Sequence, residues 1–254
     1  MKKVLIAGAT GSMGKQAIRL VEKRADCQLV AVLAPTATAN TELEKTVQRF
    51  DHLSAVETDA DIWIDFTTPQ AVFANTKFAL EHHMRPIVGT SGLTADQIKN
   101  LQRLASEKNL GGIIAPNFGL SAVLLMKFAQ AAARYFPEAE IVELHHADKV
   151  DAPSATAIAT AKMIAAGRHK AEQKSARDAP RARGANYDGI AVHAVRLPGY
   201  VAHEQVLFGG PGEALTIRQD SFERSSFMQG VKVALDQVMN LTELVVGLEN
   251  ILTI

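Results

Sequence analysis

Short apolar runs alternate with segments of helical spacing or composition along the first half of the chain. Each run has the length of a buried strand, and each following segment has the character of a helix. Strands and helices that alternate in this way predict an α/β fold with a mostly parallel, doubly wound sheet of the Rossmann type. The expected strands are 2–7, 28–33, 61–66, 86–90 and 112–115, and the expected helices are 15–21, 69–82 and 95–108.

The pattern of the second half is different and predicts a second α+β domain with a mixed or antiparallel sheet. Helical segments are expected at 121–135 and 157–166, and strands of alternating polarity at 139–144, 192–197, 203–208 and 214–220.

Three further segments have a distinct composition. The glycine-rich loop 209–213 has the residues of a hairpin turn. The polar, basic segment 168–189 is expected to be a mobile surface excursion, a basic lid over an acidic substrate being the less favoured alternative. From Phe227 onward the apolar residues follow helical spacing, which indicates core packing rather than a site.

A glycine-rich turn, Gly8-Ala-Thr-Gly11-Ser-Met-Gly14, connects the first strand to the first helix. In dinucleotide-binding folds the first glycine permits a tight turn, the second lets backbone approach a pyrophosphate, and the third allows close packing of helix on strand. The position of the turn, with a strand before and a helix after, therefore predicts a site for NADPH or NADH.

The choice between these two cofactors depends on the residue that follows the second strand. An acidic residue there accepts hydrogen bonds from the adenosine ribose of NADH. Here the strand runs through Leu33 into Ala34-Pro35-Thr36, and Thr36, Thr38 and Asn40 are the hydrogen-bonding residues that follow. With no acid in this stretch, we expect no strong preference for NADH and a slight preference for NADPH or dual use.

The segment Glu143-Leu-His-His-Ala-Asp-Lys-Val-Asp-Ala-Pro-Ser-Ala-Thr156 combines groups that suit an acidic substrate. His145 or His146 can exchange a proton near neutral pH, and Lys149 offers a positive charge to a carboxylate. A metal site is less favoured, because no cysteine or tight carboxylate cluster completes a coordination sphere.

The same segment contains the start of a helix. If Pro153 occupies the first helical turn, the amides of Ser154, Ala155 and Thr156 point outward at the positive end of the helix dipole. An anion is expected to bind there.

Composition favours a small-molecule ligand. Acidic and basic residues balance to a formal net charge of zero, which gives no overall field to attract nucleic acid or a membrane surface. The single Cys27 excludes an intramolecular disulfide and suits a reducing cytosol. No segment is long and apolar enough to span a bilayer, and Gly8 and Gly11 interrupt the apolar start well short of a signal sequence.

Several motifs together resemble the 4-hydroxy-tetrahydrodipicolinate reductase family, also called dihydrodipicolinate reductases. They are Gly8-Ala-Thr-Gly-Ser-Met-Gly14, Gly89-Thr-Ser-Gly92, Ala115-Pro-Asn-Phe118 and above all the segment from His145 to Thr156. The resemblance covers essentially the whole chain. It implies NAD(P)H-dependent reduction of 4-hydroxy-tetrahydrodipicolinate to tetrahydrodipicolinate in the diaminopimelate and lysine pathway.

The resemblance also implies roles for individual residues. His145 would be the general acid/base and Lys149 a proton donor, while His146 and the helix start at Ser154, Ala155 and Thr156 would contact the substrate. The cofactor site would be lined by Gly8, Ala9, Thr10, Gly11, Ser12, Met13, Gly89, Thr90, Ser91, Ala115, Pro116, Asn117 and Phe118.

Family members are usually cytoplasmic homotetramers built through the sheet of the second domain. The implied domains are 1–120 for the nucleotide, to which 228–254 returns, and 121–227 for substrate and assembly. The chain has Ala155 where the family has glycine and Ser91 where it has a second threonine. A reductase of another amino-acid derivative, or a nucleotide-binding regulator with weak catalysis, is the alternative function, and Ala155 is the only support for the regulator.

Overall fold

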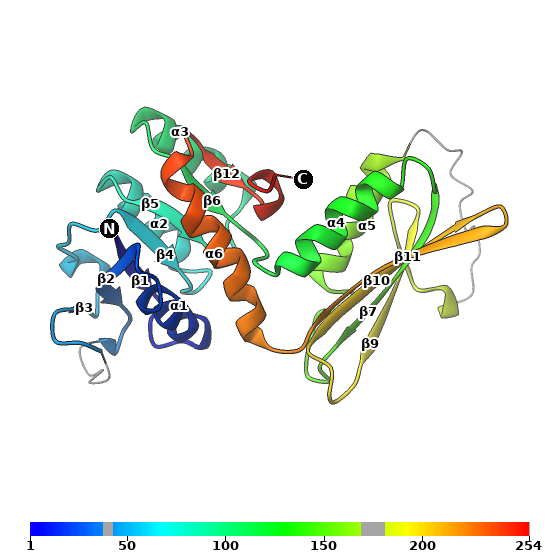
Figure 1. The fold of residues 1–254 in the computed structure, drawn as a ribbon, viewed down its shortest axis with the longest axis horizontal. Helices are drawn as coiled ribbons and strands as arrows, with labels where there is room; N and C mark the ends of the chain where they lie inside the picture. Colours follow the sequence, from blue (N-terminus) through cyan, green and yellow to red (C-terminus); the bar gives the residue numbers. More distant parts are fainter. Residues whose placement is uncertain (38–42, 169–180, 254) are drawn as a thin grey trace. The chain divides into compact units, whose positions relative to one another are not determined.

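The computed structural model describes residues 1–37, 43–168 and 181–253. The chain forms two compact units (Figure 1). Unit 1 consists of residues 1–118 and 227–254, and unit 2 consists of residues 119–226.

Unit 1 contains a seven-stranded sheet in the order β12-β6-β5-β4-β1-β2-β3. Every neighbouring pair of strands is parallel. The chain proceeds outward from β1 to β2 and β3 on one side and to β4, β5 and β6 on the other, so the strand order reverses beside β1. The predicted doubly wound sheet is therefore confirmed. Its strands are β1 (Lys2–Ala7), β2 (Cys27–Leu33), β3 (Gln48–Phe50), β4 (Ile62–Asp65), β5 (Arg85–Val88), β6 (Gly112–Ile114) and β12 (Leu244–Val246).

The helices of unit 1 pack on this sheet through apolar faces. In α1 the buried residues Gly14, Ala17, Ile18 and Val21 follow helical spacing. The start of α3 is fixed by a capping box, in which Thr94 and Gln97 each accept a hydrogen bond from the other's backbone amide. The helices are α1 (Ser12–Glu22), α2 (Val72–Glu81), α3 (Ala95–Glu107) and α6 (Met228–Gln237), with 3-10 turns at Leu53–Ala55, Val238–Asn240 and Leu248–Asn250.

The glycine-rich turn after β1 has the tight geometry that its sequence predicts. Gly8 has a φ of +80°, a conformation that side chains disfavour. A Cβ at Gly14 would lie 2.1 Å from the carbonyl oxygen of Gly8. Both glycines are therefore required for α1 to start directly above the end of β1.

Unit 2 contains a five-stranded mixed sheet in the order β11-β10-β7-β9-β8, which confirms the predicted second domain class. The β7–β9 pair is parallel, whereas β10 is antiparallel to both of its neighbours and β8 is antiparallel to β9. The strands are β7 (Glu138–His145), β8 (Ala185–Tyr187), β9 (Ile190–Arg196), β10 (Ala202–Gly210) and β11 (Glu213–Ser221). The helices are α4 (Leu120–Ala132) and α5 (Ala155–Gly167), with 3-10 turns at Arg181–Arg183 and Arg224–Phe227.

Helices α4 and α5 lie along one face of this sheet (Figure 1). Their core residues, such as Leu125 and Ala161, pack against Ile141, Val206 and Phe208 from the strands. The opposite face carries Val142 and Leu144, which are half-buried, and Leu207, which is 39% exposed. On this face, which the two helices of unit 2 do not cover, apolar side chains lie beside polar ones, since Glu140 is paired with Leu207 and His193 with Val142.

Three strands are absent from the sequence-based prediction. Strands β3 and β12 have only three residues each, too few to show a period. Strand β8 lies within the expected surface excursion 168–189, so its pairing with β9 corrects that prediction for 185–187. Residues 169–180 of the same segment lie outside the described residues.

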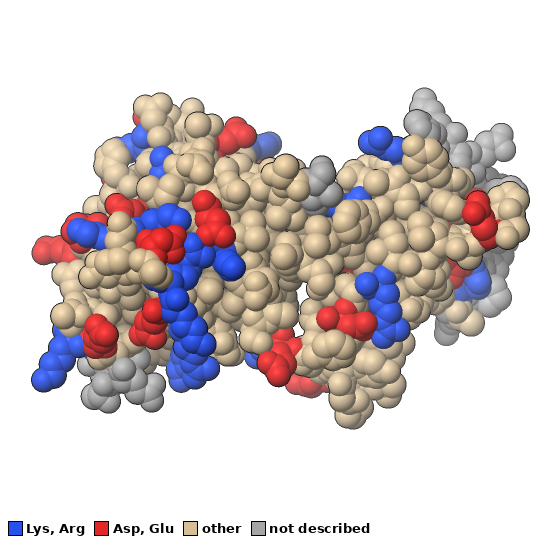
Figure 2. Space-filling model, in the orientation of Figure 1, with Lys and Arg blue, Asp and Glu red and all other residues tan. Residues whose placement is uncertain are grey.

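Charged side chains of both signs intermingle on the face of the molecule that Figure 2 shows. This distribution agrees with the formal net charge of zero. Among the described residues, no helix is long and apolar enough to cross a membrane.

An ionisable side chain, Glu204, lies within the packed face of unit 2. It is 2% exposed and its strand register places it opposite Glu143, which is also buried. Burial raises the Glu204 pKa to about 7, the negative charge of Glu143 acts in the same direction, and a hydrogen bond from Thr160 opposes them. Glu204 is therefore held as a neutral acid in mildly acidic solution.

This pKa predicts a pH dependence of stability. The unfolded chain ionises Glu204 above its ordinary pKa of 4.5, whereas the folded chain keeps the proton up to about pH 7. The stabilisation is thus complete below pH 4.5 and is lost as the pH rises through 7. Urea unfolding at pH 5 and pH 8 measures this effect. From pH 5 to pH 8, the free energy of unfolding of wild type should fall by about 3 kcal/mol more than that of Glu204→Gln.

The matched control is Glu213→Gln, which removes an exposed carboxylate from the neighbouring strand. It should lose as much stability as wild type across this pH range. If Glu204→Gln follows the same pH dependence as wild type, Glu204 is ionised in the folded protein at pH 5 and the assignment is wrong.

Candidate functional site

The predicted substrate segment is organised around a buried carboxylate, Glu143, near the end of β7. The side chain has no solvent exposure. Arg196 of β9 donates to both of its oxygens, at 2.7 and 2.8 Å, and the backbone amide of Ser154 donates at 3.0 Å. A fourth hydrogen bond joins Glu143 Oε2 to His145 Nδ1 at 2.5 Å. One side chain thus connects β7, β9 and the start of α5.

These donors determine the charge of Glu143. Burial alone would raise its pKa, but the hydrogen bonds from His145, Arg196 and the Ser154 amide outweigh burial and lower the pKa to about 2. At neutral pH Glu143 is therefore ionised and can only accept hydrogen bonds. His145 Nδ1 must then carry the proton of this contact, which leaves Nε2 as the ring atom that can exchange a proton.

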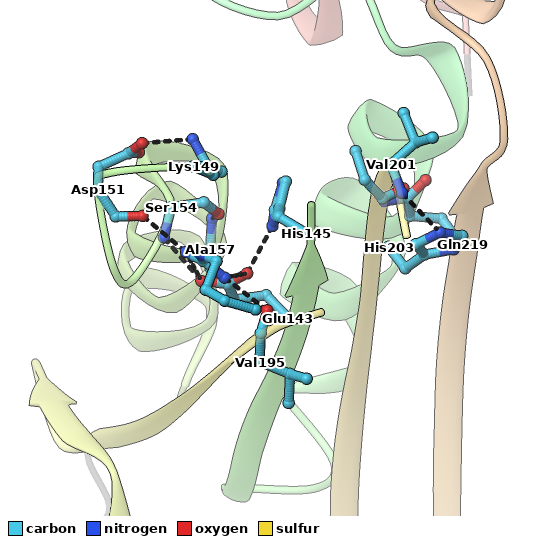
Figure 3. A network of polar contacts seen from close by, with 12 residues as sticks. Glu143, His145, Lys149, Asp151, Ser154, Ala157, Val195, Val201, His203 and Gln219 are labelled. Atoms are coloured by element: carbon cyan, nitrogen blue, oxygen red, sulfur yellow. Dashed lines mark hydrogen bonds and ion pairs between the residues drawn. The ribbon is translucent and has the colours of Figure 1, made fainter. Parts of the chain in front are cut away.

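Two other members of the segment contact nearby carboxylates. Lys149 Nζ lies 2.5 Å from Asp151 Oδ1, and His146 Nδ1 lies 2.6 Å from Asp148 Oδ1. Figure 3 shows Lys149 turned toward Asp151, while the His145 ring is turned toward Glu143. The structure therefore places His145 and Lys149 in the same short segment but against different carboxylates.

The start of α5 differs from the prediction in two respects. The helix begins at Ala155 with Ser154 as its N-cap, so Pro153 precedes the first turn rather than occupying it. The Ser154 amide is bound by Glu143, and the Ser154 hydroxyl accepts from the Ala157 amide at 3.2 Å. The hydrogen bond from Lys149 is the largest cause that lowers the pKa of Asp151, and the Ala155 amide has a smaller effect in the same direction. The Ser154 amide is thus already engaged by a carboxylate of the protein, and the Ala155 amide lies near a second one.

Unit 1 contains a cavity of about 430 Å³ at the carboxyl ends of its strands. It lies where the strand order reverses beside β1, the position at which open α/β sheets bind nucleotides. Three groups of residues line it: the turn after β1, the ends of β2 and β3, and the loop after β4 with α2. They are Gly8, Thr10, Gly11, Leu33, Ala34, Pro35, Asp51, His52, Leu53, Phe66, Thr67, Thr68, Ala71 and Asn75.

The loops beside this cavity are connected by a buried carboxylate at the end of β4, Asp65. It accepts hydrogen bonds from the hydroxyls of Thr67 at 2.6 Å and Thr90 at 2.7 Å. Trp63 Nε1 and Asn75 Nδ2 donate to its other oxygen at 3.1 and 3.0 Å. Asp65 therefore fixes the loop after β5 to the loop after β4.

The predicted cofactor residues all follow strands of this parallel sheet. Gly8, Thr10 and Gly11 line the cavity, while Ala9 is buried and Ser12 and Met13 form the first turn of α1. Gly89, Thr90 and Ser91 follow β5, and Ala115, Pro116, Asn117 and Phe118 follow β6.

The loops after β4, β5 and β6 are packed together at this edge of the sheet. The rings of Phe66 and Phe118 meet edge to face with centroids 6.0 Å apart. A Cβ at Gly89 would lie 2.3 Å from the Phe66 ring and 3.0 Å from the Phe118 ring.

The hydrogen-bonding residues predicted to follow β2 are Thr36, Thr38 and Asn40. Thr36 is exposed, and Thr38 and Asn40 lie outside the described residues.

The sequence predicts no role for Glu143, Arg196 or Asp65, although Glu143 begins the predicted substrate segment. For Glu143 a local signal exists, because residues two apart on a strand share a face and His145 is two residues away. For Arg196 there is none, since it reaches the site only through the pairing of β7 with β9, which puts it opposite His145. Asp65 likewise depends on contacts from three separate segments of the chain.

Comparison with known proteins assigns both halves of the chain to one enzyme family. The model described as "Dihydrodipicolinate reductase, N-terminus" matches residues 2–118, and the model of the C-terminus matches residues 121–252. The 4-hydroxy-tetrahydrodipicolinate reductase of Lactobacillus acidophilus is 59% identical over 257 residues, 99% of this chain and 98% of that protein. The one of Limosilactobacillus fermentum is 59% identical over 259 residues, 99% and 100%.

Solved structures agree with this assignment. The dipicolinate-bound dihydrodipicolinate reductase from Paenisporosarcina sp. TG-14 is 45% identical, covers 99% of this chain and 100% of its own, and has a TM-score of 0.89. The apo scyllo-inositol dehydrogenase from Lactobacillus casei has a TM-score of 0.64 at 13% identity, covers 94% of this chain and 88% of its own, and so is similar in fold alone.

Proposed function

This chain belongs to the dihydrodipicolinate reductase family, and we propose that it reduces 4-hydroxy-tetrahydrodipicolinate at the His145 segment. The product is tetrahydrodipicolinate, with loss of water, in the diaminopimelate branch of lysine biosynthesis. The reductant is NAD(P)H, as in the family, and unit 1 is the nucleotide-binding unit. The observation that carries the proposal is the hydrogen bond from His145 to the buried, ionised Glu143.

The residues of unit 1 fit a dinucleotide. The turn at Gly8 and Gly11 brings bare backbone to the cavity, and α1 directs the positive end of its dipole to the same place. The predicted residues after β1, β5 and β6 would hold the cofactor there, and Asp65 would keep two of their loops in place. Bound there, NAD(P)H supplies the hydride.

His145 is the proposed general acid/base. Its Nδ1–H is held by Glu143, so Nε2 exchanges the proton that the substrate ring requires after hydride arrives. A carboxylate that fixes the tautomer and orientation of a catalytic imidazole has the same role in hydrolytic triads. Arg196 and the Ser154 amide compensate the charge of Glu143, which keeps the carboxylate ionised while His145 gains and loses its proton.

Lys149 and the start of α5 form the proposed carboxylate site. Asp151 now engages Lys149 Nζ, and the Ala155 amide acts on the same carboxylate. A substrate carboxylate has the same chemistry as the Asp151 side chain, so it would take over these donors, with the Thr156 amide and His146 as further contacts. Lys149 would also donate a proton. The dipicolinate bound to the Paenisporosarcina relative supports a dicarboxylate ligand.

Ser154 and Ala155 have distinct parts in this arrangement. Ser154 holds the helix start through its amide and hydroxyl, and so positions the site. Ala155 adds a Cβ where the family has glycine, and this methyl group would lie beside the substrate carboxylate.

Substitution of His145 and Lys149 tests the assignment. We expect His145→Ala and Lys149→Ala each to lower turnover roughly 10²- to 10⁴-fold, because each would remove a group that transfers a proton. The dissociation constants of NADPH and NADH should stay within about twofold of wild type, and Lys149→Ala should also weaken dipicolinate binding. Steady-state assays with enzymatically generated substrate, together with calorimetric titration of both cofactors and dipicolinate, measure these effects.

The matched control is His193→Ala. His193 is bonded to Glu140 at 2.9 Å on the same sheet, so it reproduces a His–Glu pair away from the proposed site. This variant should keep wild-type turnover. Full turnover in His145→Ala would remove His145 from the mechanism, and a wild-type protein without turnover on this substrate would contradict the proposed function.

We also propose a cytoplasmic homotetramer. The uncovered sheet face of unit 2, with Val142, Leu144 and Leu207, supports assembly through this sheet, and the biosynthetic family supports the location. Sedimentation equilibrium should give four times the chain mass of 27.3 kDa. Leu207→Asp should lower this mass, whereas Tyr135→Asp, at an exposed site outside the sheet, should not. A wild-type monomer would refute the assembly.

A further inference from the structure

The end of β2 lacks the acidic residue that usually recognises an adenosine ribose, but the neighbouring strand supplies one. Strands β2 and β3 are parallel, with Leu33 paired to Phe50. The amide of Ala34 donates to the Phe50 carbonyl oxygen at 3.1 Å, which extends this register by one residue. Asp51 follows Phe50 directly. It therefore emerges beside Ala34, at the same carboxyl edge of the sheet.

The position of Asp51 relative to the cofactor cavity is equally specific. Asp51 lines the cavity of about 430 Å³ together with the glycine turn at Gly8 and Gly11 and with Ala34 and Pro35 after β2. These residues all belong to unit 1. Among the described residues that line this cavity, Asp51 is the only one with a carboxylate, and the neighbouring His52 is the only other ionisable one.

A carboxylate at this place has a definite effect on cofactor choice. In dinucleotide-binding folds, an acidic side chain at the end of the second strand accepts hydrogen bonds from the ribose hydroxyls. Charge-assisted hydrogen bonds of this kind are stronger than neutral ones. The 2′-phosphate of NADPH would instead bring a second negative charge against the carboxylate.

We propose that Asp51 is the specificity-determining residue for the adenosine ribose, replacing the acid that is missing after Leu33. The carboxylate accepts hydrogen bonds from the ribose hydroxyls of NADH and repels the 2′-phosphate of NADPH. The protein consequently binds NADH at least as tightly as NADPH, in contrast to the preference expected from residues 34–40 alone. The proposal concerns cofactor binding and does not depend on the roles of His145 and Lys149.

The test compares two cofactors on one variant. NADH and NADPH are titrated into full-length wild type and Asp51→Asn by calorimetry, without substrate. The ratio of the NADH dissociation constant to that of NADPH should rise about tenfold or more in Asp51→Asn, as loss of a charge-assisted hydrogen bond and of charge repulsion predicts. NADPH itself should bind more tightly. Asp51→Glu, which retains the charge, should keep a ratio closer to wild type than Asp51→Asn does.

The matched control is Glu57→Gln, which removes an exposed carboxylate six residues farther along the chain that does not line the cavity. It should leave the ratio within about twofold of wild type, a change too small for loss of a charge-assisted hydrogen bond. Two results would overturn the proposal: an unchanged ratio in Asp51→Asn, whether or not both cofactors bind more weakly, or an equal shift of the ratio in Glu57→Gln. Because the ratio is taken on the same protein preparation, a general folding defect cannot imitate the expected result.

Discussion

The proposed substrate site depends on the hydrogen bonds that compensate the negative charge of the buried Glu143. An ionised carboxylate without solvent contact is costly unless donors surround it, and here four hydrogen bonds do so. These donors come from β7, from β9 and from the start of α5. Compensation of this one charge therefore holds two strands and a helix start together. It also engages Nδ1 of His145, so Nε2 is the ring nitrogen that can exchange a proton.

A similar arrangement occurs in unit 1, where Asp65 at the end of β4 joins the loops after β4 and β5. In both units a buried carboxylate at a strand end orders the segments that would contact a ligand. Glu204, which lies opposite Glu143 in unit 2, differs from Glu143, because burial without enough donors raises the Glu204 pKa to about 7. The number of donors, rather than burial alone, distinguishes the ionised Glu143 from the neutral Glu204.

The sequence predicts the elements with strong periodicity, both fold classes, the glycine turn and the histidine segment. It misses strands β3, β8 and β12, whose three residues are too few to show a period. It also misses Arg196 and the position of Asp51, because both depend on which strands pair and in what register. The incorrect helix start has a local cause: Ser154 caps the helix more effectively than Pro153 initiates it, since its hydroxyl accepts from the Ala157 amide.

The most direct test of the central role of Glu143 is the tautomer of His145 in the ligand-free protein. Nitrogen chemical shifts of ¹⁵N-histidine-labelled protein at pH 8 distinguish a proton on Nδ1 from one on Nε2, and comparison with His145→Ala assigns the signal. The account predicts that neutral His145 carries its proton on Nδ1, donated to Glu143. A proton on Nε2 would mean that Glu143 does not accept this hydrogen bond, and it would contradict the proposed organisation of the site.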